Sequence, residues 1–414
     1  MRIAIIGAGI GGLAAALSLH AAGFDEIRVY ERAAQIRGLG VGINLLPHAV
    51  RELTELGLAD RIAALGTAPG SLAYYNRFGQ EIWSEPRGID AGYRWPQLSV
   101  HRGELQLALQ HAVRERLGDI VRTGHRLTEV TEREDAAAAR FATDDGPLEV
   151  EADLIVGADG IHSALRAQRY PDEGPPPWSG LTLWRGTAIG PAFLDGRTMI
   201  MAGDGDQKFV AYPLSEPDAS GTARINFIAE RRGTGTPTAD WNRAVDAGPI
   251  ADLFALWRFE WLDVPALITA AEEILEYPMV DRDPLPQWST GRSTLLGDAA
   301  HAMYPNGSNG ASQAIIDART LAYRLATEAG VPSALAAYEA DRRPVTAALL
   351  ESTRQTGPER VMLLARERAP EGFTHIHDVI PADELAEIAA SYKRAAGFDP
   401  AGLNTRASLS VVRS

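Results

Sequence analysis

A glycine-rich turn between a short strand and a helix is the feature that most restricts the fold of this chain. Residues 2–6 read Arg-Ile-Ala-Ile-Ile, an apolar run typical of a buried parallel strand. Residues 7–12 follow with the spacing Gly-x-Gly-x-x-Gly, residues 13–19 favour a helix, and residues 27–30 favour a second strand. This order predicts a strand–helix–strand unit at the start of an α/β domain.

The spacing of the three glycines indicates dinucleotide binding. Gly7 permits a tight turn, Gly9 lets the backbone approach a pyrophosphate, and Gly12 lets the helix pack close to the strand. Glu31 lies 19 residues after Gly12, where a carboxylate accepts hydrogen bonds from an adenosine ribose. An acid there disfavours a 2′-phosphate, so FAD or NAD fits better than NADP. The alternatives are a glycine turn without a ligand and a solvated Glu31.

Composition excludes several other chemistries. The chain has 414 residues, no cysteine and a formal net charge of −14. Without cysteine there is no disulfide, thiol nucleophile or iron–sulfur cluster, so redox chemistry would need an organic cofactor or a metal held by His and carboxylates. The acidic balance argues against nucleic-acid binding. The most apolar stretch, residues 3–19, contains four glycines. It therefore predicts no membrane span, and a cytoplasmic protein is expected.

Two later segments repeat the pattern of a strand that runs into a polar turn. The strand in residues 153–166 meets an Asp-Gly turn at 159–160, and the strand in residues 293–305 meets a Gly-Asp turn at 297–298. A long amphipathic helix is expected to begin at Gly310. With these three motifs in order, residues 1–345 resemble the single-component FAD-dependent aromatic hydroxylases of the para-hydroxybenzoate and salicylate hydroxylase type. The resemblance decides for FAD over NAD.

The resemblance implies an α/β fold in which a Rossmann-type FAD-binding domain is interleaved with a β-sheet substrate domain, followed by a helical C-terminal segment. The expected parts are residues 1–72, 100–177 and 286–345 for the FAD-binding domain, 73–99 and 178–285 for the sheet domain, and 346–414 for the helical segment, of which 391–414 is a candidate mobile tail. A closer likeness is to phenazine-modifying monooxygenases that act on 5-methylphenazine-1-carboxylate. The segments that show this likeness are residues 38–47, 83–88, 100–106, 277–286 and 304–316.

Roles at the cofactor follow from the resemblance position by position. Asp298 is similar to the aspartate that hydrogen-bonds the ribityl chain, and Arg102 to the arginine near the pyrophosphate-ribityl region. Residues 40–42 resemble the loop beside the mobile isoalloxazine ring. Where many members have Gly-Gln-Gly-x-Asn, this chain has Ser308-Asn309-Gly310, which puts a side-chain contact there in doubt. The expected FAD contacts are Gly7, Gly9, Ile10, Gly11, Gly12, Glu31, Arg32, Val41, Gly42, Arg102, Leu127, Asp159, Asp298, Gly310 and Ala311.

The candidate substrate pocket lies in the expected sheet domain. All eight tryptophans fall between residues 83 and 288, as in an aromatic-binding sheet, although core packing explains most single tryptophans. Arg185 is a candidate anchor for a carboxylate. No metal is expected, because His375 and His377 lack an evident third ligand, and His301 either lies near the flavin or packs a turn. The pocket candidates are Trp184, Arg185, Met201, Phe209, Tyr212, Tyr304 and Pro305.

The implied reaction is hydroxylation of an aromatic or N-heteroaromatic small molecule. NADH or NADPH would reduce FAD, and O₂ would then form a flavin C4a-hydroperoxide. No second glycine turn of this kind occurs, so the nicotinamide cofactor would bind transiently. Decarboxylative hydroxylation of an aromatic carboxylate is a further hypothesis. The alternatives are a flavin oxidoreductase or epoxidase on the same scaffold, or a non-catalytic flavin-binding protein. A monomer or a homodimer is expected.

Overall fold

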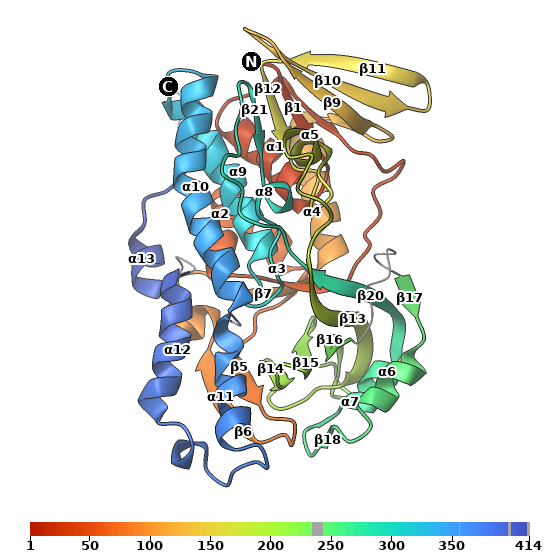
Figure 1. The fold of residues 1–414 in the computed structure, drawn as a ribbon, viewed down its shortest axis with the longest axis vertical. Coiled ribbons are helices and arrows are strands. Elements are labelled where there is room, and N and C mark those ends of the chain that lie inside the picture. The colour runs from red at the N-terminus through yellow and green to blue at the C-terminus, as the bar shows by residue number, and fades with distance from the viewer. Residues whose placement is uncertain (234–242, 356, 396–398, 412–414) are drawn as a thin grey trace.

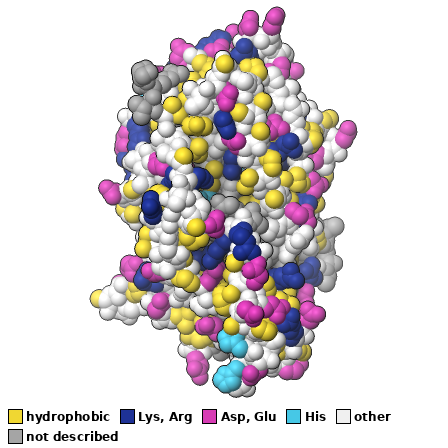
Figure 2. Space-filling view, turned by 90° about the vertical axis from the view of Figure 1, so that its left-hand side faces the viewer, with side chains coloured by type: hydrophobic (Ala, Val, Ile, Leu, Met, Phe, Trp, Pro, Cys, Tyr) yellow, Lys and Arg dark blue, Asp and Glu magenta, His cyan; other side chains and the backbone are white. Residues whose placement is uncertain are grey.

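The computed structural model describes residues 1–233, 243–355, 357–395 and 399–411. A parallel sheet among helices forms the upper half, a larger and mainly antiparallel sheet forms the lower half, and the C-terminal helices run along one side of both (Figure 1). The predicted α/β fold with a second, sheet-based part is confirmed. On the face that the C-terminal helices form, acidic and basic side chains are interspersed (Figure 2).

The parallel sheet is built from five short strands. Its order is β21-β12-β1-β2-β8, and neighbouring strands pair in parallel. Every residue of β1 and β12 is buried, as expected for strands of a parallel sheet. The strands are β1 (Ile3–Ile6), β2 (Ile27–Tyr30), β8 (Val121–Arg122), β12 (Leu154–Gly157) and β21 (Ser293–Leu295).

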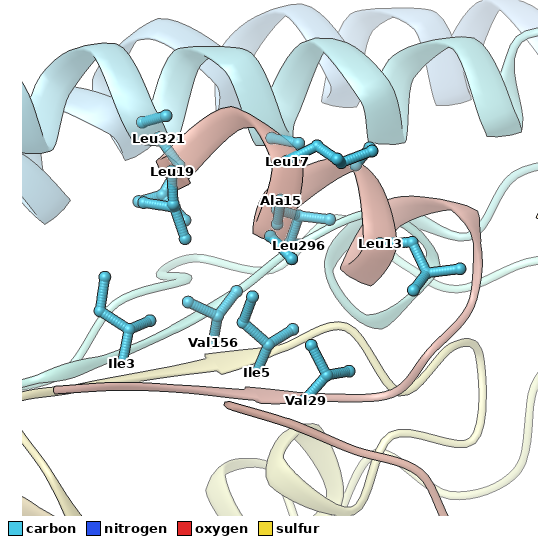
Figure 3. Packing of buried hydrophobic residues seen from close by; sticks show 14 of the residues in the cluster. Ile3, Ile5, Leu13, Ala15, Leu17, Leu19, Val29, Val156, Leu296 and Leu321 are labelled. Atoms are coloured by element: carbon cyan, nitrogen blue, oxygen red, sulfur yellow. The ribbon is translucent and has the colours of Figure 1, made fainter. Parts of the chain in front are cut away.

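Helix α1 (Ile10–Ala21) lies between this sheet and helix α9 (Gly310–Thr327) (Figure 3). Ile5 and Val156 point from the sheet toward α1, and Leu321 of α9 approaches Leu19 from the other side (Figure 3). Because α1 is enclosed on both sides, the glycine turn that precedes it is held firmly against the sheet.

Smaller elements complete the parallel-sheet half. Strands β9, β10 and β11 form one antiparallel sheet, and β3, β7 and β4 form another. The bounds are β3 (Gly42–Leu45), α2 (Pro47–Glu55), α3 (Ala59–Ala63), β4 (Gly66–Thr67), β7 (Leu98–His101), α4 (Arg102–Leu117), β9 (Arg126–Glu132), β10 (Ala137–Thr143), β11 (Gly146–Ala152), α5 (Ala164–Arg169) and α8 (Asp298–His301).

The lower sheet joins two separate parts of the chain. Its order is β17-β20-β13-β16-β15-β14-β5-β6, and β14 pairs in parallel with β5 although more than a hundred residues separate them. The other neighbours pair antiparallel. The strands are β5 (Ser71–Tyr75), β6 (Glu81–Pro86), β13 (Trp178–Pro191), β14 (Thr198–Gly203), β15 (Gln207–Pro213), β16 (Thr222–Arg232), β17 (Arg243–Val245) and β20 (Ala271–Val280).

The two faces of this sheet have different neighbours. The outer face packs on α6 (Ala247–Leu253), α7 (Val264–Thr269) and the hairpin of β18 (Arg258–Phe259) and β19 (Leu262–Asp263). The inner face packs partly on α11 (Arg360–Arg368) and the segment leading into α12 (Ala382–Ala395). Since side chains alternate along a strand, adjacent residues such as Trp184 and Arg185 serve opposite faces.

The C-terminal segment returns to the parallel-sheet half. After α10 (Val331–Arg354), α11 and α12, helix α13 (Pro400–Thr405) lies beside α2, where Arg51 donates from Nη2 to the carbonyl oxygen of Arg406 at 2.8 Å. Arg406 in turn forms an ion pair with the buried Glu52. Part of the tail for which mobility is expected thus contacts α2 through arginine and carboxylate side chains, and residues 396–398 and 412–414 lie outside the described residues.

Candidate functional site

The three glycines of the turn are required for different reasons. A Cβ at Gly7 would lie 2.4 Å from the carbonyl oxygen of Ala158, and a Cβ at Gly12 would lie 2.0 Å from the carbonyl oxygen of Gly7. A Cβ at Gly9 would meet no heavy atom within 4 Å. The protein itself therefore demands glycine at positions 7 and 12, whereas at position 9 the open space is what a closely approaching ligand needs.

Glu31 lies directly beside this turn. Its Oε2 accepts from the backbone N–H of Ala8 at 2.8 Å, and its Oε1 accepts from that of Ala33 at 2.9 Å. The carboxylate is thus held at the end of β2, as the sequence pattern predicts. Arg32 is exposed, and Leu127 of β9 is buried in the core beneath the same sheet.

A second polar corner lies beside the glycine turn, since a Cβ at Gly11 would lie 2.9 Å from Leu296. Asp298 is exposed at the first position of α8, after Gly297 with a φ of 62°. Helix α9 begins at Gly310, whose Cβ would lie 3.8 Å from Oδ1 of Asp298. The predicted start of the long helix at Gly310 is confirmed. Its free N–H groups and the Asp298 carboxylate therefore open onto the same space.

Buried charged side chains stabilise the turn that carries Asp298. Asp317 of α9 accepts from the backbone N–H of Gly297 at 3.0 Å and from Nε of Arg342 at 2.7 Å, and it contacts Nε2 of His301 at 2.6 Å. Burial acts to raise the pKa of Asp317, but His301 and Arg342 together lower it to about 2. His301 thus packs the turn, with its ring 5.3 Å from that of Trp288, and does not line the cavity described below.

A hydrogen-bonded joint connects the 40–42 loop to the lower sheet. Gly42 donates its N–H to Oδ1 of Asn226 at 2.6 Å and accepts at its carbonyl from Nη2 of Arg185 at 3.1 Å. The neighbouring Val41 is buried, and its carbonyl accepts from the N–H of Arg102 at 2.9 Å. The loop is therefore fixed from both halves of the molecule.

These elements enclose a cavity of about 330 Å³ between the two sheets. It extends from the glycine turn, past Asp298 and the start of α9, to the inner face of β14, β15 and β16. Of the expected FAD contacts it brings together Gly9, Ile10, Gly11, Arg102, Asp298, Gly310 and Ala311. Of the expected pocket residues it brings together Arg185, Met201, Tyr212, Tyr304 and Pro305.

Trp184 and Phe209 do not line this cavity. Both pack in the outer-face core of the lower sheet, Phe209 with no exposed surface, and Trp184 donates from Nε1 to Glu276 at 2.8 Å. Their strand neighbours Arg185 and Val210 point to the cavity instead. Because side chains alternate along a strand, the sequence could have shown that only one residue of each neighbouring pair faces the cavity. Sequence reasoning missed the lining residues Ile43, Asn44, Met199, Val210, Ile228, Glu230, Asn306 and Glu359.

Asp159 has a local structural partner. Its Oδ2 accepts from the N–H of Ala164 at 2.7 Å, at the start of α5. Burial raises the pKa of Asp159, although the hydrogen bonds from Ser163 and Ala164 act to lower it. Its flanking residues Ala158 and Gly160 line the cavity, so the Asp-Gly turn borders the site.

The residues present fit an FAD molecule. The open approach at Gly9, two helix N-termini, the Glu31 carboxylate and the apolar far wall match a dinucleotide with a planar ring at one end. Among the described residues, no three His, Asp or Glu side chains lie close enough to hold a metal ion. No described helix is long and apolar enough to cross a membrane.

Comparison with known proteins supports this assignment. Residues 1–174 and 269–353 match the family model described as FAD binding domain. A phenazine 1,6-dicarboxylic acid hydroxylase from Lysobacter antibioticus is 44% identical over 400 residues, covering 94% of this chain and 96% of that protein. A 6-hydroxynicotinate 3-monooxygenase from Bordetella bronchiseptica is 33% identical and covers 81% of this chain and 85% of its own. A salicylate hydroxylase from Pseudomonas putida is 32% identical, with 86% and 85% covered.

Solved structures show the same fold. A salicylate hydroxylase substrate complex has a TM-score of 0.75 at 22% identity and covers 100% of this chain and 98% of its own. Klebsiella pneumoniae HpxO complexed with FAD and uric acid has a TM-score of 0.73 at 24% identity, with 95% and 92% covered. The resemblance carried by the sequence motifs is thereby confirmed. The chain binds FAD and belongs to the FAD-dependent aromatic hydroxylase family.

Proposed function

We propose that this chain hydroxylates an aromatic or N-heteroaromatic carboxylate, with NADH or NADPH as a transient electron donor and O₂ as the oxidant. The observation that supports this most is the cavity itself, in which a dinucleotide end and an apolar aromatic-sized end are continuous. FAD supplies the redox chemistry when bound. One oxygen atom of O₂ enters the product, the other leaves as water, and the two electrons come from the nicotinamide.

The chain's own residues would orient the substrate and exclude water. Met201, Val210 and Ile228 form an apolar wall on the inner face of the lower sheet, which limits solvent at the reacting carbon. Tyr212 lies on the same wall, and burial raises its pKa to about 12, so its hydroxyl stays protonated at neutral pH. The wall thus offers a flat apolar surface and one hydroxyl donor.

Arg185 is the proposed anchor for the substrate carboxylate. Its guanidinium lines the cavity, and its buried Nε–H has no hydrogen-bond partner among the described residues. A buried donor of this kind is stabilised by an anionic acceptor. Where the carboxylate sits on the attacked carbon, hydroxylation at that carbon would release it as CO₂. This decarboxylation is part of the proposal and is tested by measuring CO₂.

The cofactor roles are also proposals. We assign Asp298 to the ribityl chain, because its carboxylate lies beside the start of α9 and lines the cavity, and Glu31 to the adenosine ribose. Asp298→Ala is expected to weaken FAD retention while the apoprotein stays folded. Full FAD content and full activity in this variant would count against the assignment.

The function is tested on the FAD-loaded enzyme. NADH and NADPH oxidation is measured with a panel of phenazines, hydroxybenzoates, aminobenzoates and indoles, and isotopically labelled O₂ is followed into the product. We expect oxidation to rise with an aromatic carboxylate and label to appear in the product hydroxyl. Oxidation without labelled product would favour the alternative of a plain flavin oxidoreductase, and no oxidation at all would favour a non-catalytic flavin-binding protein.

Arg185→Met tests whether Arg185 binds the substrate carboxylate or only supports the structure of the site. Loss of a charge-assisted hydrogen bond is expected to raise KM for carboxylated substrates by about 10- to 100-fold more than for a neutral analogue, because the neutral analogue reports only the loss of the bond between Arg185 and Gly42. Arg243→Met is the matched control, because Arg243 belongs to the same sheet but pairs with Glu276 at its edge. An equal loss for both substrate types would contradict the anchoring role.

A further inference from the structure

The far end of the substrate cavity holds charges that the proposed function leaves unexplained. Glu230 and Glu359 line the cavity at this end, and each forms an ion pair with Lys208, at 2.9 Å and 2.6 Å. Lys208 and Glu230 face each other directly across β15 and β16. Glu359 comes from the turn that precedes α11. Two carboxyl groups thus share one ammonium group at a buried wall, and burial together with Glu359 raises the pKa of Glu230 against the opposing effect of Lys208. When both are ionised, the cluster carries a negative excess.

Arg185 also acts electrostatically on Glu230, but the cations on the other side of Glu230 and Glu359 are already paired. A second cavity of about 670 Å³ shares Glu230 and Glu359 with the substrate cavity as lining residues and is also lined by Arg354 and Arg366. Arg354 pairs with Asp281 and Asp283, and Arg366 pairs with Asp204 and Asp206. Each of these cations therefore already has carboxylate partners of its own.

The opposite end of the substrate cavity has the opposite sign. Arg185 lies directly across from Ile228 in the paired strands β13 and β16, and Glu230 lies two residues farther along β16 on the same face. Two residues of strand advance by about 7 Å, which is on the scale of a fused aromatic ring system. A bound ring would therefore have a cation at one edge and a net negative cluster at the other.

Resting on the proposed function, we propose that Glu230 and Glu359 are specificity-determining residues for the edge of the substrate that points away from Arg185. They select an aromatic acid whose far edge presents a hydrogen-bond donor or a positive charge, such as an amino, hydroxyl or ring N–H group. They select against a second carboxylate at that edge, because two like charges would be buried together.

Two probes that differ at one position test this selection. The first is 6-aminophenazine-1-carboxylate and the second is phenazine-1,6-dicarboxylate, and their dissociation constants are measured on the FAD-loaded enzyme by perturbation of the flavin spectrum. We expect the amino probe to bind about tenfold more tightly or better, since a single buried like-charge contact is worth at least that much. Glu230→Gln and Glu359→Gln should each bring the ratio of the two constants toward one.

The controls keep the outcomes distinct. Glu276→Gln changes a carboxylate of the same sheet that pairs on the outer face with Trp184 and Arg243, and it should leave the ratio unchanged. Equal binding of the two probes by the unaltered enzyme, tighter binding of the dicarboxylate, or an unchanged ratio in both glutamine variants would overturn the inference while leaving the hydroxylase proposal intact. If neither probe binds, this inference is overturned, whereas the proposed function fails only if no aromatic acid of the wider panel stimulates NAD(P)H oxidation.

Discussion

At the scale of single residues, Gly9 and Gly12 separate what the fold needs from what the cofactor needs. Gly9→Ala is expected to lower FAD affinity strongly with little change in the stability of the apoprotein, because a Cβ there meets no heavy atom within 4 Å of the protein. Gly12→Ala should destabilise the fold itself, by about 1–3 kcal/mol or more from overpacking, because its Cβ would lie 2.0 Å from the backbone of Gly7. Thermal unfolding with and without FAD checks both. Equal losses of apoprotein stability in the two variants would contradict the distinction.

Residues whose role is set by local spacing were predictable from the sequence. The glycine turn and Glu31 belong to one continuous strand–helix–strand unit, so their positions follow from the chain itself. The pocket residues were chosen by aromatic type, and type does not tell which face of a strand a side chain serves. Phe209 and Tyr212 cannot share a face of one regular strand, since their spacing is odd. Val210 and Glu230, which do line the cavity, lack a sequence signal apart from this alternation.

At the scale of elements, Asp317 joins α8, α9 and α10. It takes three contacts, from the Gly297 N–H, His301 and Arg342. Asp317→Asn is expected to lower the free energy of unfolding by about 3 kcal/mol, because one partner of a buried charge pair is removed. Asp341→Asn is the control. Asp341 of α10 pairs at the surface with Arg324, so its loss should cost about 1 kcal/mol or less. Chemical denaturation measures both, and equal costs would argue against the buried joint.

The same carboxylate gives the joint a pH dependence. The pKa of Asp317 is about 2 in the folded protein, below the value of about 4 for an unfolded aspartate. Its stabilising contribution is therefore fully present above pH about 4 and is lost as the pH falls toward about 2. The acid-induced loss of stability in this window should be smaller in Asp317→Asn than in the unaltered protein. A denaturation series across the window tests this, and parallel curves would contradict it.

At the scale of the whole molecule, the C-terminal residues contact α2, which lies far from them in the sequence. Glu52 is fully buried and pairs with both Arg319 and Arg406. Arg406→Ala should lower the free energy of unfolding by about 1–2 kcal/mol through loss of a partly buried charged hydrogen bond to the buried Glu52. Arg394→Ala, which removes an exposed pair with Glu387, should have little effect. Equilibrium unfolding measures both, and a neutral Arg406→Ala would show that the tail adds no stability.

The sequence predicted the fold class and the cofactor but not this contact. The α/β class follows from strands and helices that are contiguous in the chain. The partnership of Arg406 with Glu52 joins residues 354 positions apart, and a polar composition gives no indication of it. The pairing of β5 with β14, which completes the lower sheet, likewise depends on tertiary contacts that local patterns do not encode.

The joint between the two halves of the molecule passes through Asn226 and Gly42. The two chains approach so closely there that a Cβ on Gly42 would lie 2.7 Å from Asn226, and Asn226 is fully buried. Asn226→Ala leaves the buried Gly42 N–H without its acceptor, at a cost of about 1–3 kcal/mol. Because only the Arg185 bond would then hold the 40–42 loop to the substrate wall, stimulation of NAD(P)H oxidation by substrate should fall about tenfold, within the usual range of coupling between two sites. FAD content and the basal oxidation rate should persist. Asn76→Ala, in the turn after β5 and far from the joint, controls for general effects on the sheet. Full stimulation in Asn226→Ala would mean that the flavin loop and the substrate wall act separately.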